Sequence, residues 1–296
     1  MKIKIRFLFL SVFSVLLAAC EKPIVSEASA SGQSEAGNVV LRFAMYEQSG
    51  FDVTRGATDI TEVCSRLNIA VFTPGGDKVK TVSQKQDDAS YGTVELSLPA
   101  GSYRVVVIAH NGDGSATITS EEKVTFANNK VTDTFYYDGE LTVGSERQVY
   151  DLTLLRAVAM FRMVITDEEI PAGVSKFKFY YLGGSSTFSP KLGYGCVQSK
   201  QTEIRAVNDE GIYEIYTMPH TEDDVLTKLT VTAQDANDNT ICERVFENIP
   251  ITRNQVTRYT GSFFTSGGAT GGNGVQGGDF RLMANPEWDG IRAFTF

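Results

Sequence analysis

The chain has 296 residues and a formal net charge of −9, from 27 basic and 36 acidic side chains, and 42% of its residues are hydrophobic. This is ample apolar material for packed cores, and a prior of roughly 100–200 residues per domain predicts two domains. The acidic balance, with no cluster of Lys and Arg, argues against nucleic acid binding, which needs a basic footprint. It also argues against attachment to anionic lipid by charge.

Residues 1–19 have the pattern of a lipoprotein signal peptide. Three basic residues within the first six precede an apolar run over 7–17, which is shorter than the roughly 20 residues of a membrane span. The sequence Leu17-Ala18-Ala19-Cys20 resembles the bacterial lipobox, in which the cysteine is acylated and becomes the first residue of the mature protein. We therefore predict lipidation at Cys20. The alternative is an ordinary signal peptide with an incidental cysteine.

The first half of the mature chain predicts a flexible tether and then a β-domain. Residues 20–37 are rich in Ser, Ala, Gly and Glu and have too little apolar surface to fold by themselves. From Asn38 onward, apolar and polar residues alternate with the period of two that is typical of strands. The strands expected here are 39–46, 67–72, 93–98, 103–109, 123–126 and 133–137, with Gly- and Pro-containing turns between them. They predict an N-terminal β-sandwich over 38–146.

The second half repeats this pattern after the polar passage 140–147. The strands expected here are 149–154, 157–165, 177–181, 202–207, 212–218, 229–233, 240–246 and 256–264. The strand 157–165 is apolar on both faces, as in the centre of a sandwich. A Gly-rich loop, 266–278, leads to a C-terminal strand segment, 279–296. The predicted fold class is all-β, with two tandem antiparallel β-sandwich domains, the second spanning 147–296.

Besides Cys20, the chain contains Cys64, Cys196 and Cys242. Three is an odd number, so at most one disulfide forms and one thiol stays free. No C-x-x-C pair is present, which argues against a structural zinc site. We expect buried thiols that pack as small apolar side chains. A Cys196–Cys242 disulfide is the alternative, since secretion permits oxidation.

The sequence offers no constellation of residues for catalysis. The two histidines, His110 and His220, lie at strand ends in different predicted domains, whereas a catalytic base must reach its nucleophile. Neither G-x-S-x-G nor H-E-x-x-H occurs, and nothing supports paired catalytic carboxylates. The glycines of 267–278 are not followed by the Lys-Ser or Lys-Thr of a phosphate loop. We therefore predict no enzyme, cofactor or metal.

The segment Asp235-Ala236-Asn237-Asp238-Asn239 has two interpretations. It looks like the D-x-N-D-N calcium segment of cadherin linkers, and its oxygen ligands would suit Ca²⁺. It also lies between two expected strands, where Asp and Asn are favoured because they tolerate turn dihedrals. Because the other cadherin motifs are missing, we favour a turn.

Several short motifs, in their order along the chain, carry a family resemblance. They are Thr54-Arg55-Gly56-Ala57-Thr58, 67–72, 98–107, 155–159, 170–174, 251–261 and Pro286-Glu287-Trp288. With the lipobox and tether, they resemble the fimbrillin-type lipoproteins of Bacteroides-like bacteria and, within them, the FimB/Mfa2 anchor branch of the type V pilus proteins. Each motif alone is weak, and it is their order that is specific.

The resemblance implies two sandwiches of transthyretin-like, Greek-key topology, surface display on the outer membrane through the lipid, and a place in a fimbria. Stalk subunits of the wider family are cut after an Arg that follows their first strand, and a neighbouring subunit fills the groove by β-strand addition. Arg55 is the matching position here, and 39–46 would be the strand removed. An anchor subunit instead keeps its lipid and first strand. The alternative for Arg55 is an exposed loop residue.

The candidate residues for strand exchange are Val39, Leu41 and Phe43 in the first strand and Phe280 and Leu282 near the C-terminus. The segment 279–296 is a candidate donor strand, and its alternative role is the last strand of the second domain. The expected partners are other fimbrial subunits, the outer membrane, and host or bacterial surface ligands. The sequence leaves the roles of anchor, stalk and tip open.

The sequence is compatible with two other classes of function. A glycan-binding lipoprotein of a nutrient-uptake system would need exposed aromatic platforms, which the 12 Tyr residues allow, with Trp288 as the only Trp. A lipid-anchored hydrolase has no motif in its favour. Glycan binding that is lost on changing a surface Tyr would favour the first of these.

Overall fold

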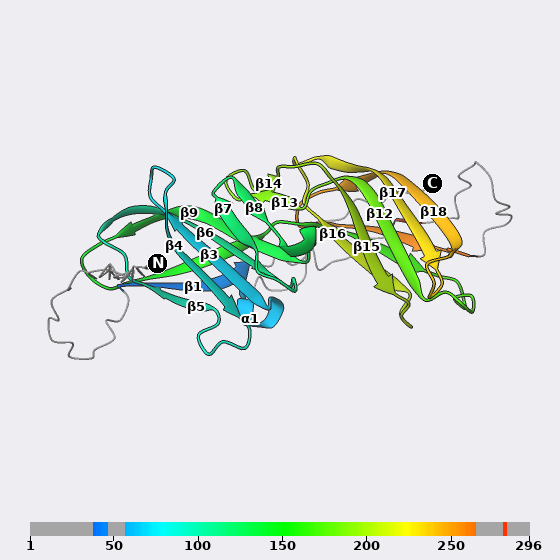
Figure 1. Ribbon diagram of the computed structural model, residues 1–296, viewed down its shortest axis with the longest axis horizontal. Coiled ribbons are helices and arrows are strands. Elements are labelled where there is room, and N and C mark those ends of the chain that lie inside the picture. The colour runs from blue at the N-terminus through cyan, green and yellow to red at the C-terminus, as the bar shows by residue number, and fades with distance from the viewer. Residues whose placement is uncertain (1–37, 47–56, 265–280, 283–296) are drawn as a thin grey trace, which may run out of the picture. The chain divides into compact units, whose positions relative to one another are not determined.

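The computed structural model describes residues 38–46, 57–264 and 281–282. Predictions about Cys20, the tether, Arg55, Phe280 and the loop 266–278 lie outside these residues. The described chain is almost entirely β, as predicted (Figure 1). Its helices are one turn of α-helix, α1 (Ile60–Val63), and a 3₁₀ segment at Ala127–Asn129. No described helix is long and apolar enough to cross a membrane.

The first sandwich is one eight-stranded sheet that folds over into two layers. One layer contains β1 (Val39–Tyr46), β2 (Ala57–Asp59), β5 (Thr93–Leu96) and β10 (Gln148–Arg156). The other contains β3 (Arg66–Phe72), β4 (Lys78–Lys85), β6 (Gly101–His110) and β9 (Thr134–Val143). The layers are joined where the end of β10 pairs with β9. Alternate side chains of both layers fill the core between them, such as Leu41 and Leu154 from the first layer and Ile69 and Val107 from the second.

The second sandwich has two four-stranded sheets. One is formed by β11 (Ala159–Ile165), β16 (Ile212–Thr217), β19 (Val256–Gly261) and β20 (Arg281–Leu282). The other is formed by β12 (Lys176–Gly184), β15 (Ser199–Ala206), β17 (Asp224–Gln234) and β18 (Thr240–Ile251). The core between the sheets is rich in aromatic rings, including Phe161, Phe246 and Tyr259, which lie in edge or tilted contact.

A fourth sheet, made of short strands, combines both halves of the chain. It is formed by β7 (Thr117–Ser120), β8 (Lys123–Thr125), β13 (Thr187–Ser189) and β14 (Tyr194–Gly195). Strand β13 pairs with β8. Its apolar residues, among them Ile118, Val124 and Phe188, pack on Ala70 and Val106 of the first sandwich. Because both faces of β3 and β6 are therefore covered, these strands read as continuous apolar runs.

The fold class predicted from the sequence is confirmed, with one difference in strand direction. Most neighbouring strands are antiparallel, but β1 runs parallel to β10 and β11 runs parallel to β19. A parallel pair needs a long crossover connection. Here 101 residues lie between the end of β1 at Tyr46 and the start of β10 at Gln148. Sequence alternation does not carry this information, because it reports which face a residue occupies and not the direction of its neighbour.

The passage 140–147 does not separate the sheets, because β10 pairs with both β1 and β9 in the first sandwich. The chain passes to the second sandwich at Ala157 and Val158, between β10 and β11. Both residues are fully buried. We propose that the boundary between two domains lies at these residues, rather than at 146/147.

A buried ion pair stands where the two sandwiches meet. Arg156, at the end of β10, donates two hydrogen bonds to the carboxylate of Asp133, at 2.8 and 3.0 Å. Its third contact is to the Asn254 Oδ1 atom, at 3.0 Å, in the turn before β19. The Arg156 side chain is 8% exposed and lies over the Phe135 ring. Removing one partner of such a pair leaves an uncompensated buried charge, so this contact ties the turn before β19 to the first sandwich.

Arg253 makes a second connection at the same place. Its Nη1 atom donates to the Tyr136 hydroxyl at 2.8 Å and to the carbonyl of Gly193 at 2.9 Å. Gly193 has a φ of +74° and lies so close that an added Cβ would be 2.5 Å from both the Arg253 guanidinium and the Tyr136 hydroxyl. The glycine is therefore required by its backbone conformation and by the approach of Arg253.

We predict that Gly193→Ala lowers the free energy of unfolding by about 2–5 kcal/mol, from left-handed strain plus overpacking at Arg253. Urea denaturation measures the change. Gly173→Ala is the matched control, because Gly173 has a φ of +100° and an added Cβ would meet nothing within 4 Å. It should cost only the strain, about 1–2 kcal/mol. Equal losses in the two variants would contradict the close contact at Gly193.

Candidate functional site

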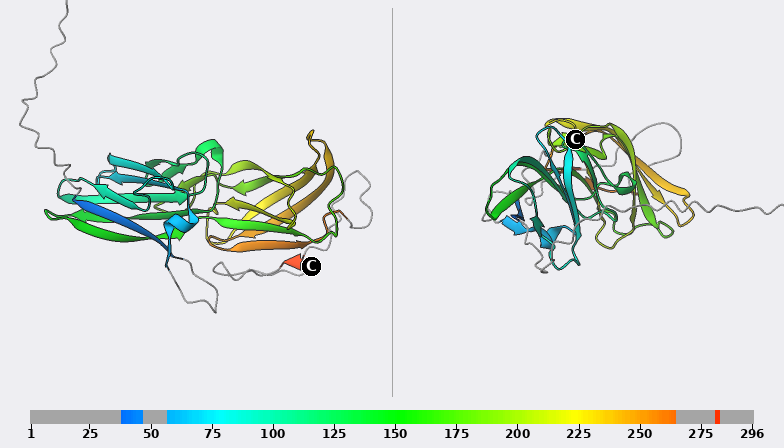
Figure 2. Two further views of the ribbon diagram at one scale, coloured as in Figure 1. Left: turned by 90° about the horizontal axis from the view of Figure 1, so that it is seen from below. Right: turned by 60° about the vertical axis from the view of Figure 1, so that its left-hand side comes forward.

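The first strand lies inside the sheet, with hydrogen-bonded neighbours on both edges (Figure 2). On one edge, β10 runs parallel to it from Val39↔Gln148 to Met45↔Leu154. On the other edge, β5 pairs with its first half and β2 with its second half. Removing β1 would therefore leave a slot with an unpaired strand edge on each side.

Three predicted strand-exchange residues point from β1 into the core. Val39 and Leu41 are 0% exposed and Phe43 is 6% exposed, and all three belong to the core of the first sandwich. Burying a side chain of this size contributes about 1.5–3 kcal/mol. The walls of the slot would be formed by apolar neighbours of the same core, including Val94, Leu96, Leu152 and Leu154. Such a slot fits a second strand with the same alternation of apolar residues.

Polar contacts hold the start of β1. The Asn38 side chain accepts from the Leu98 amide at 2.9 Å and donates to the Leu98 carbonyl at 2.6 Å. The Asn38 carbonyl accepts from the Gln148 amide at 2.9 Å. Farther along, Arg42 pairs with Asp151 of β10, with a shortest N–O distance of 2.8 Å. These residues were missed in the sequence, where Asn38 only marked the end of the tether.

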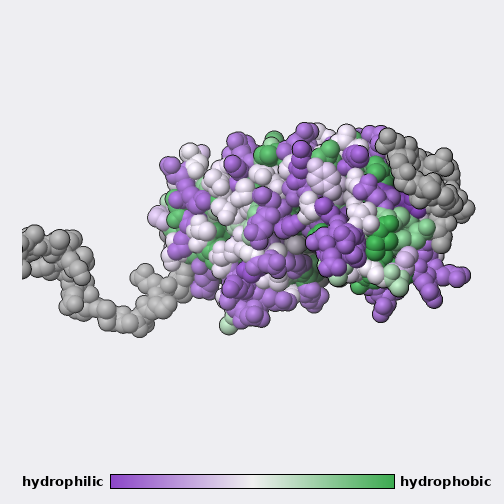
Figure 3. Space-filling model, turned by 45° about the vertical axis from the view of Figure 1, so that its right-hand side comes forward, coloured by the Kyte–Doolittle hydropathy of each residue, from purple (hydrophilic) through white to green (hydrophobic). Residues whose placement is uncertain are grey.

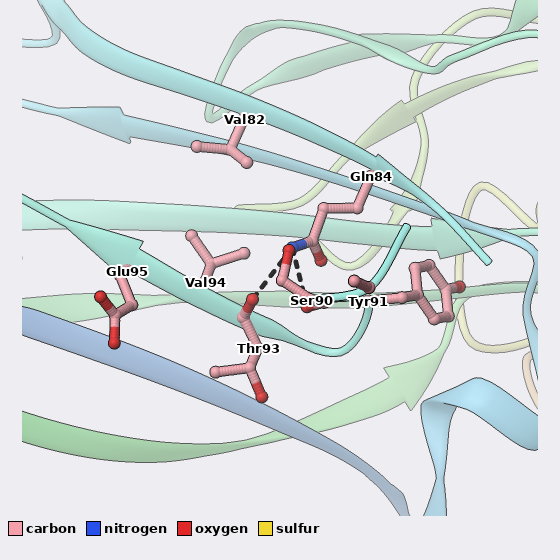
Figure 4. Close-up of a pocket in the computed structure, with 8 residues that line it drawn as sticks. Val82, Gln84, Ser90, Tyr91, Thr93, Val94 and Glu95 are labelled. Atoms are coloured by element: carbon pink, nitrogen blue, oxygen red, sulfur yellow. Dashed lines mark hydrogen bonds between the residues drawn. The ribbon is translucent and has the colours of Figure 1, made fainter. Parts of the chain in front are cut away.

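A hollow of about 490 Å³ lies between β4 and β5, lined by Val82, Gln84, Ala89, Ser90, Tyr91, Thr93, Val94 and Glu95 (Figure 4). Gln84 holds its rim, because its Nε2 atom donates to the carbonyls of Ser90 and Thr93 at 3.0 and 2.9 Å. Glu95 is the one titratable carboxylate in this lining. The hollow is therefore lined mostly by uncharged side chains of β4, β5 and the loop that connects them.

The C-terminal candidate is described only in part. Strand β20 pairs antiparallel with β19, with Leu282 opposite Tyr259. The rest of 279–296 lies outside the described residues. Donor strand and last strand of the second sandwich both remain predictions for this segment.

The histidines take part in two separate networks. His110 is 1% exposed, and its Nδ1 atom accepts from the Gly112 amide at 3.0 Å while its Nε2 atom lies 3.1 Å from the Asn68 Oδ1 atom. Burial, with Arg66 nearby, lowers the pKa of His110 to about 4. The ring is therefore neutral and donates from Nε2, which is a structural role. His220 lies 3.0 Å from the Asp224 carboxylate and is half-buried.

All three cysteines among the described residues are free thiols. The alternative of a Cys196–Cys242 disulfide is therefore wrong. Cys64 is buried in the first core, and this burial raises the pKa of its thiol well above the ordinary value. Cys196 is exposed and Cys242 half-buried, so only Cys64 fits the expectation of a fully buried apolar side chain.

The segment 235–239 forms a turn held by one carboxylate. Asp235 accepts from the amides of Asn237 and Asn239, both at 2.8 Å, and from the Asn239 side chain at 2.9 Å. Asp238 adopts a φ of +67°. This is the self-bonded turn that we favoured over a calcium site.

The chain matches the sequence pattern of one protein family over residues 31–290. It belongs to this family, described as "Family of unknown function (DUF6562)". No curated protein matches the chain. The family assignment therefore leaves the activity open.

Solved structures show the fold more widely. A candidate polysaccharide-binding protein from Bacteroides thetaiotaomicron is 11% identical, with a TM-score of 0.55 over 86% of this chain and 98% of its own. A candidate adhesin from Bacteroides ovatus is 12% identical, with a TM-score of 0.52 over 86% and 94%. The fimbrial anchor protein Mfa2 from Porphyromonas gingivalis is 12% identical, with a TM-score of 0.45 over 86% and 99%. At these identities the likeness concerns the fold, which the first two share with this chain.

We predict that Leu41→Ala lowers the free energy of unfolding by about 2–5 kcal/mol, because it removes a large side chain from a closed core. The matched control is Arg42→Ala on the next residue, whose side chain is 56% exposed and should cost about 1 kcal/mol or less. Chemical denaturation of both variants measures the difference. A Leu41→Ala loss no larger than the control would show that β1 is not an integral strand.

The buried neutral His110 predicts a pH dependence of stability. Its pKa is about 4 when folded and about 6.5 when unfolded. Below pH 6.5 the unfolded state therefore binds more protons, and stability falls as the pH drops from about 6.5 towards 4, by up to about 1.4 kcal/mol per pH unit. His110→Gln should be less stable at pH 7 but should lose less stability on going to pH 4.5. Equal losses in the two proteins would contradict this assignment.

Proposed function

We propose that the protein is a non-enzymatic surface lipoprotein of the outer membrane that anchors a fimbria. Acyl chains on Cys20 would hold it, and residues 20–37 would separate the sandwiches from the membrane. Two or more acyl chains anchor durably, whereas a single chain binds only marginally. Cell adhesion would follow from assembly with other fimbrial subunits.

The placement of β1 is the observation that carries this proposal. It is an inner strand with buried side chains, and its loss would open a slot of the kind that accepts a partner strand. A chain that keeps β1 closes this slot and has no acceptor there, which suits the last subunit at the membrane. A chain cut after Arg55 would have the slot open and would suit a stalk subunit.

Assembly would then use β-strand addition at another position, for which the segment 279–296 is our candidate. The exposed apolar side chains are scattered, which favours assembly by strand pairing over docking of one apolar face on another. The most exposed apolar side chains, such as Leu192, Val149 and Val197, belong to different strands and loops. On the face shown in Figure 3, hydrophobic residues stand in separate groups among polar ones. Deletion of 279–296 separates the two roles of this segment, because a donor strand can be lost without unfolding.

The test of the anchoring role is Cys20→Ser in cells that express the full chain. We expect loss of palmitate labelling and release of the protein and its fibres from the surface, because the sulfur atom that carries the lipid is absent. Ser26→Ala, in the predicted tether, is the control and should retain both. Surface attachment of the Cys20→Ser protein at the normal level would contradict the proposal.

A glycan-binding role is the second candidate, favoured by one observation. Tyr180 of β12 is the aromatic side chain with the largest exposed fraction among the described side chains, 37%. It stands on a sheet face beside Thr202 and Thr230, its neighbours in register. One of the similar structures is a candidate polysaccharide-binding protein. Binding on a glycan array that disappears with Tyr180→Ala would favour this role over anchoring.

A further inference from the structure

Each sandwich places its entry and exit strands side by side and parallel. In the first sandwich these are β1, where the chain enters, and β10, from which it leaves. In the second sandwich they are β11 and β19, paired from Met160↔Val256 to Ile165↔Gly261. A chain pulled by its two ends therefore pulls on both of these pairs.

The direction of the strands decides how the load acts. Residue 38 and Gln148 lie at the same end of the β1–β10 ladder, since the Asn38 carbonyl accepts from the Gln148 amide. The exit at Arg156 lies at the other end. A pull at residue 38 against a pull at residue 157 therefore slides β1 along β10, and all hydrogen bonds of the ladder carry the load together. A pull on two adjacent ends would instead break them one after another.

The second sandwich has the same geometry. At the entry end of the β11–β19 ladder, the Met160 amide donates to the Gln255 carbonyl at 3.1 Å. At the exit end the Thr166 amide donates to the Gly261 carbonyl at 3.0 Å. The linker 157–158 joins the exit of the first ladder directly to the entry of the second. Asn254 donates its amide to the Val158 carbonyl at 2.8 Å, within that linker.

We propose that the two parallel ladders are mechanical clamps in series, which let this chain bear tension between its N-terminal attachment and a partner bound to its second sandwich. The proposal rests on the proposed anchoring function for the origin of the tension. The resistance itself follows from strand direction alone. It assigns the retained first strand a function beyond filling the core.

Side chains reinforce the first clamp at the point where the load enters. The two hydrogen bonds between Asn38 and Leu98 fix the start of β1 to the segment after β5. The Arg42–Asp151 ion pair spans the sliding interface itself. Arg147, beside the start of β10, pairs with Glu95 of β5 at 2.6 Å, across the register position of Val40. The Asn38 and Arg42 contacts must break when β1 slides, whereas the Arg147–Glu95 pair holds together the two strands on either side of β1.

Single-molecule pulling of the mature chain tests the proposal in two geometries. Both use a handle on Cys20 of the unlipidated mature chain and Cys64→Ala, Cys196→Ser and Cys242→Ser to remove the other native thiols. The second handle is either at the C-terminus, which shears the ladders, or on Glu146→Cys, which opens β1 from β10 at one end. Glu146 is exposed, in the loop before β10. With the C-terminal handle, release of 38–156 should add roughly 40 nm of contour length at 3.3–3.6 Å per residue.

We expect the rupture force of the first sandwich to be higher with the C-terminal handle, because the bonds of the ladder then share the load and do not break one after another. Equal or lower force in that geometry would overturn the proposal.

The charge pair provides a variant that keeps the core intact. Arg42→Glu should lower the force in the shear geometry, and Arg42→Glu with Asp151→Arg should restore it. An unchanged force in Arg42→Glu would contradict the reinforcement by this ion pair and would leave the resistance to the backbone ladder of β1 and β10. Neither measurement depends on where the protein is located, so equal forces would refute the clamps and leave the anchoring proposal standing.

Discussion

The parallel pairing of β1 with β10 is the constraint on which the rest of this structure depends. It places the first strand inside the sheet, where Val39, Leu41 and Phe43 complete the core. Parallel neighbours need a crossover connection. Here the connection from β1 to β10 contains all of the strands from β2 to β9. The same pairing brings the point where the chain enters the first sandwich beside the strand that leads out of it.

The second sandwich is attached to the first through buried groups and not through a polar linker. Arg156 contacts Asp133 on one side and Asn254 on the other, and Arg253 reaches Tyr136 and Gly193. The shared sheet of β7, β8, β13 and β14 covers the outer face of β3 and β6. These contacts bring together two motifs, around Arg156 and Arg253, that are far apart in sequence.

The sequence predicts the strands well and their partners poorly. Alternation located most of the long strands, because a half-buried strand must alternate. It missed β4, whose side chains are mostly polar and exposed. It could not show that β10 belongs to the first sandwich, since the polar passage 140–147 has the composition of a linker although it spans the end of β9 and a tight connection to β10. The strand 39–46 was predicted. The polar contacts of Asn38 and Asp151 could not be predicted from the sequence, because each depends on a partner about 60 or more residues away.

The measurement that tests the central claim most directly is intact mass and N-terminal analysis of the protein recovered from cell-surface fibres. The account predicts a lipidated Cys20 at the N-terminus, with β1 still attached to the chain. A terminus at Gly56 would contradict it, because the protein would then have lost β1, opened the slot beside β10 and given up both its lipid and its first clamp.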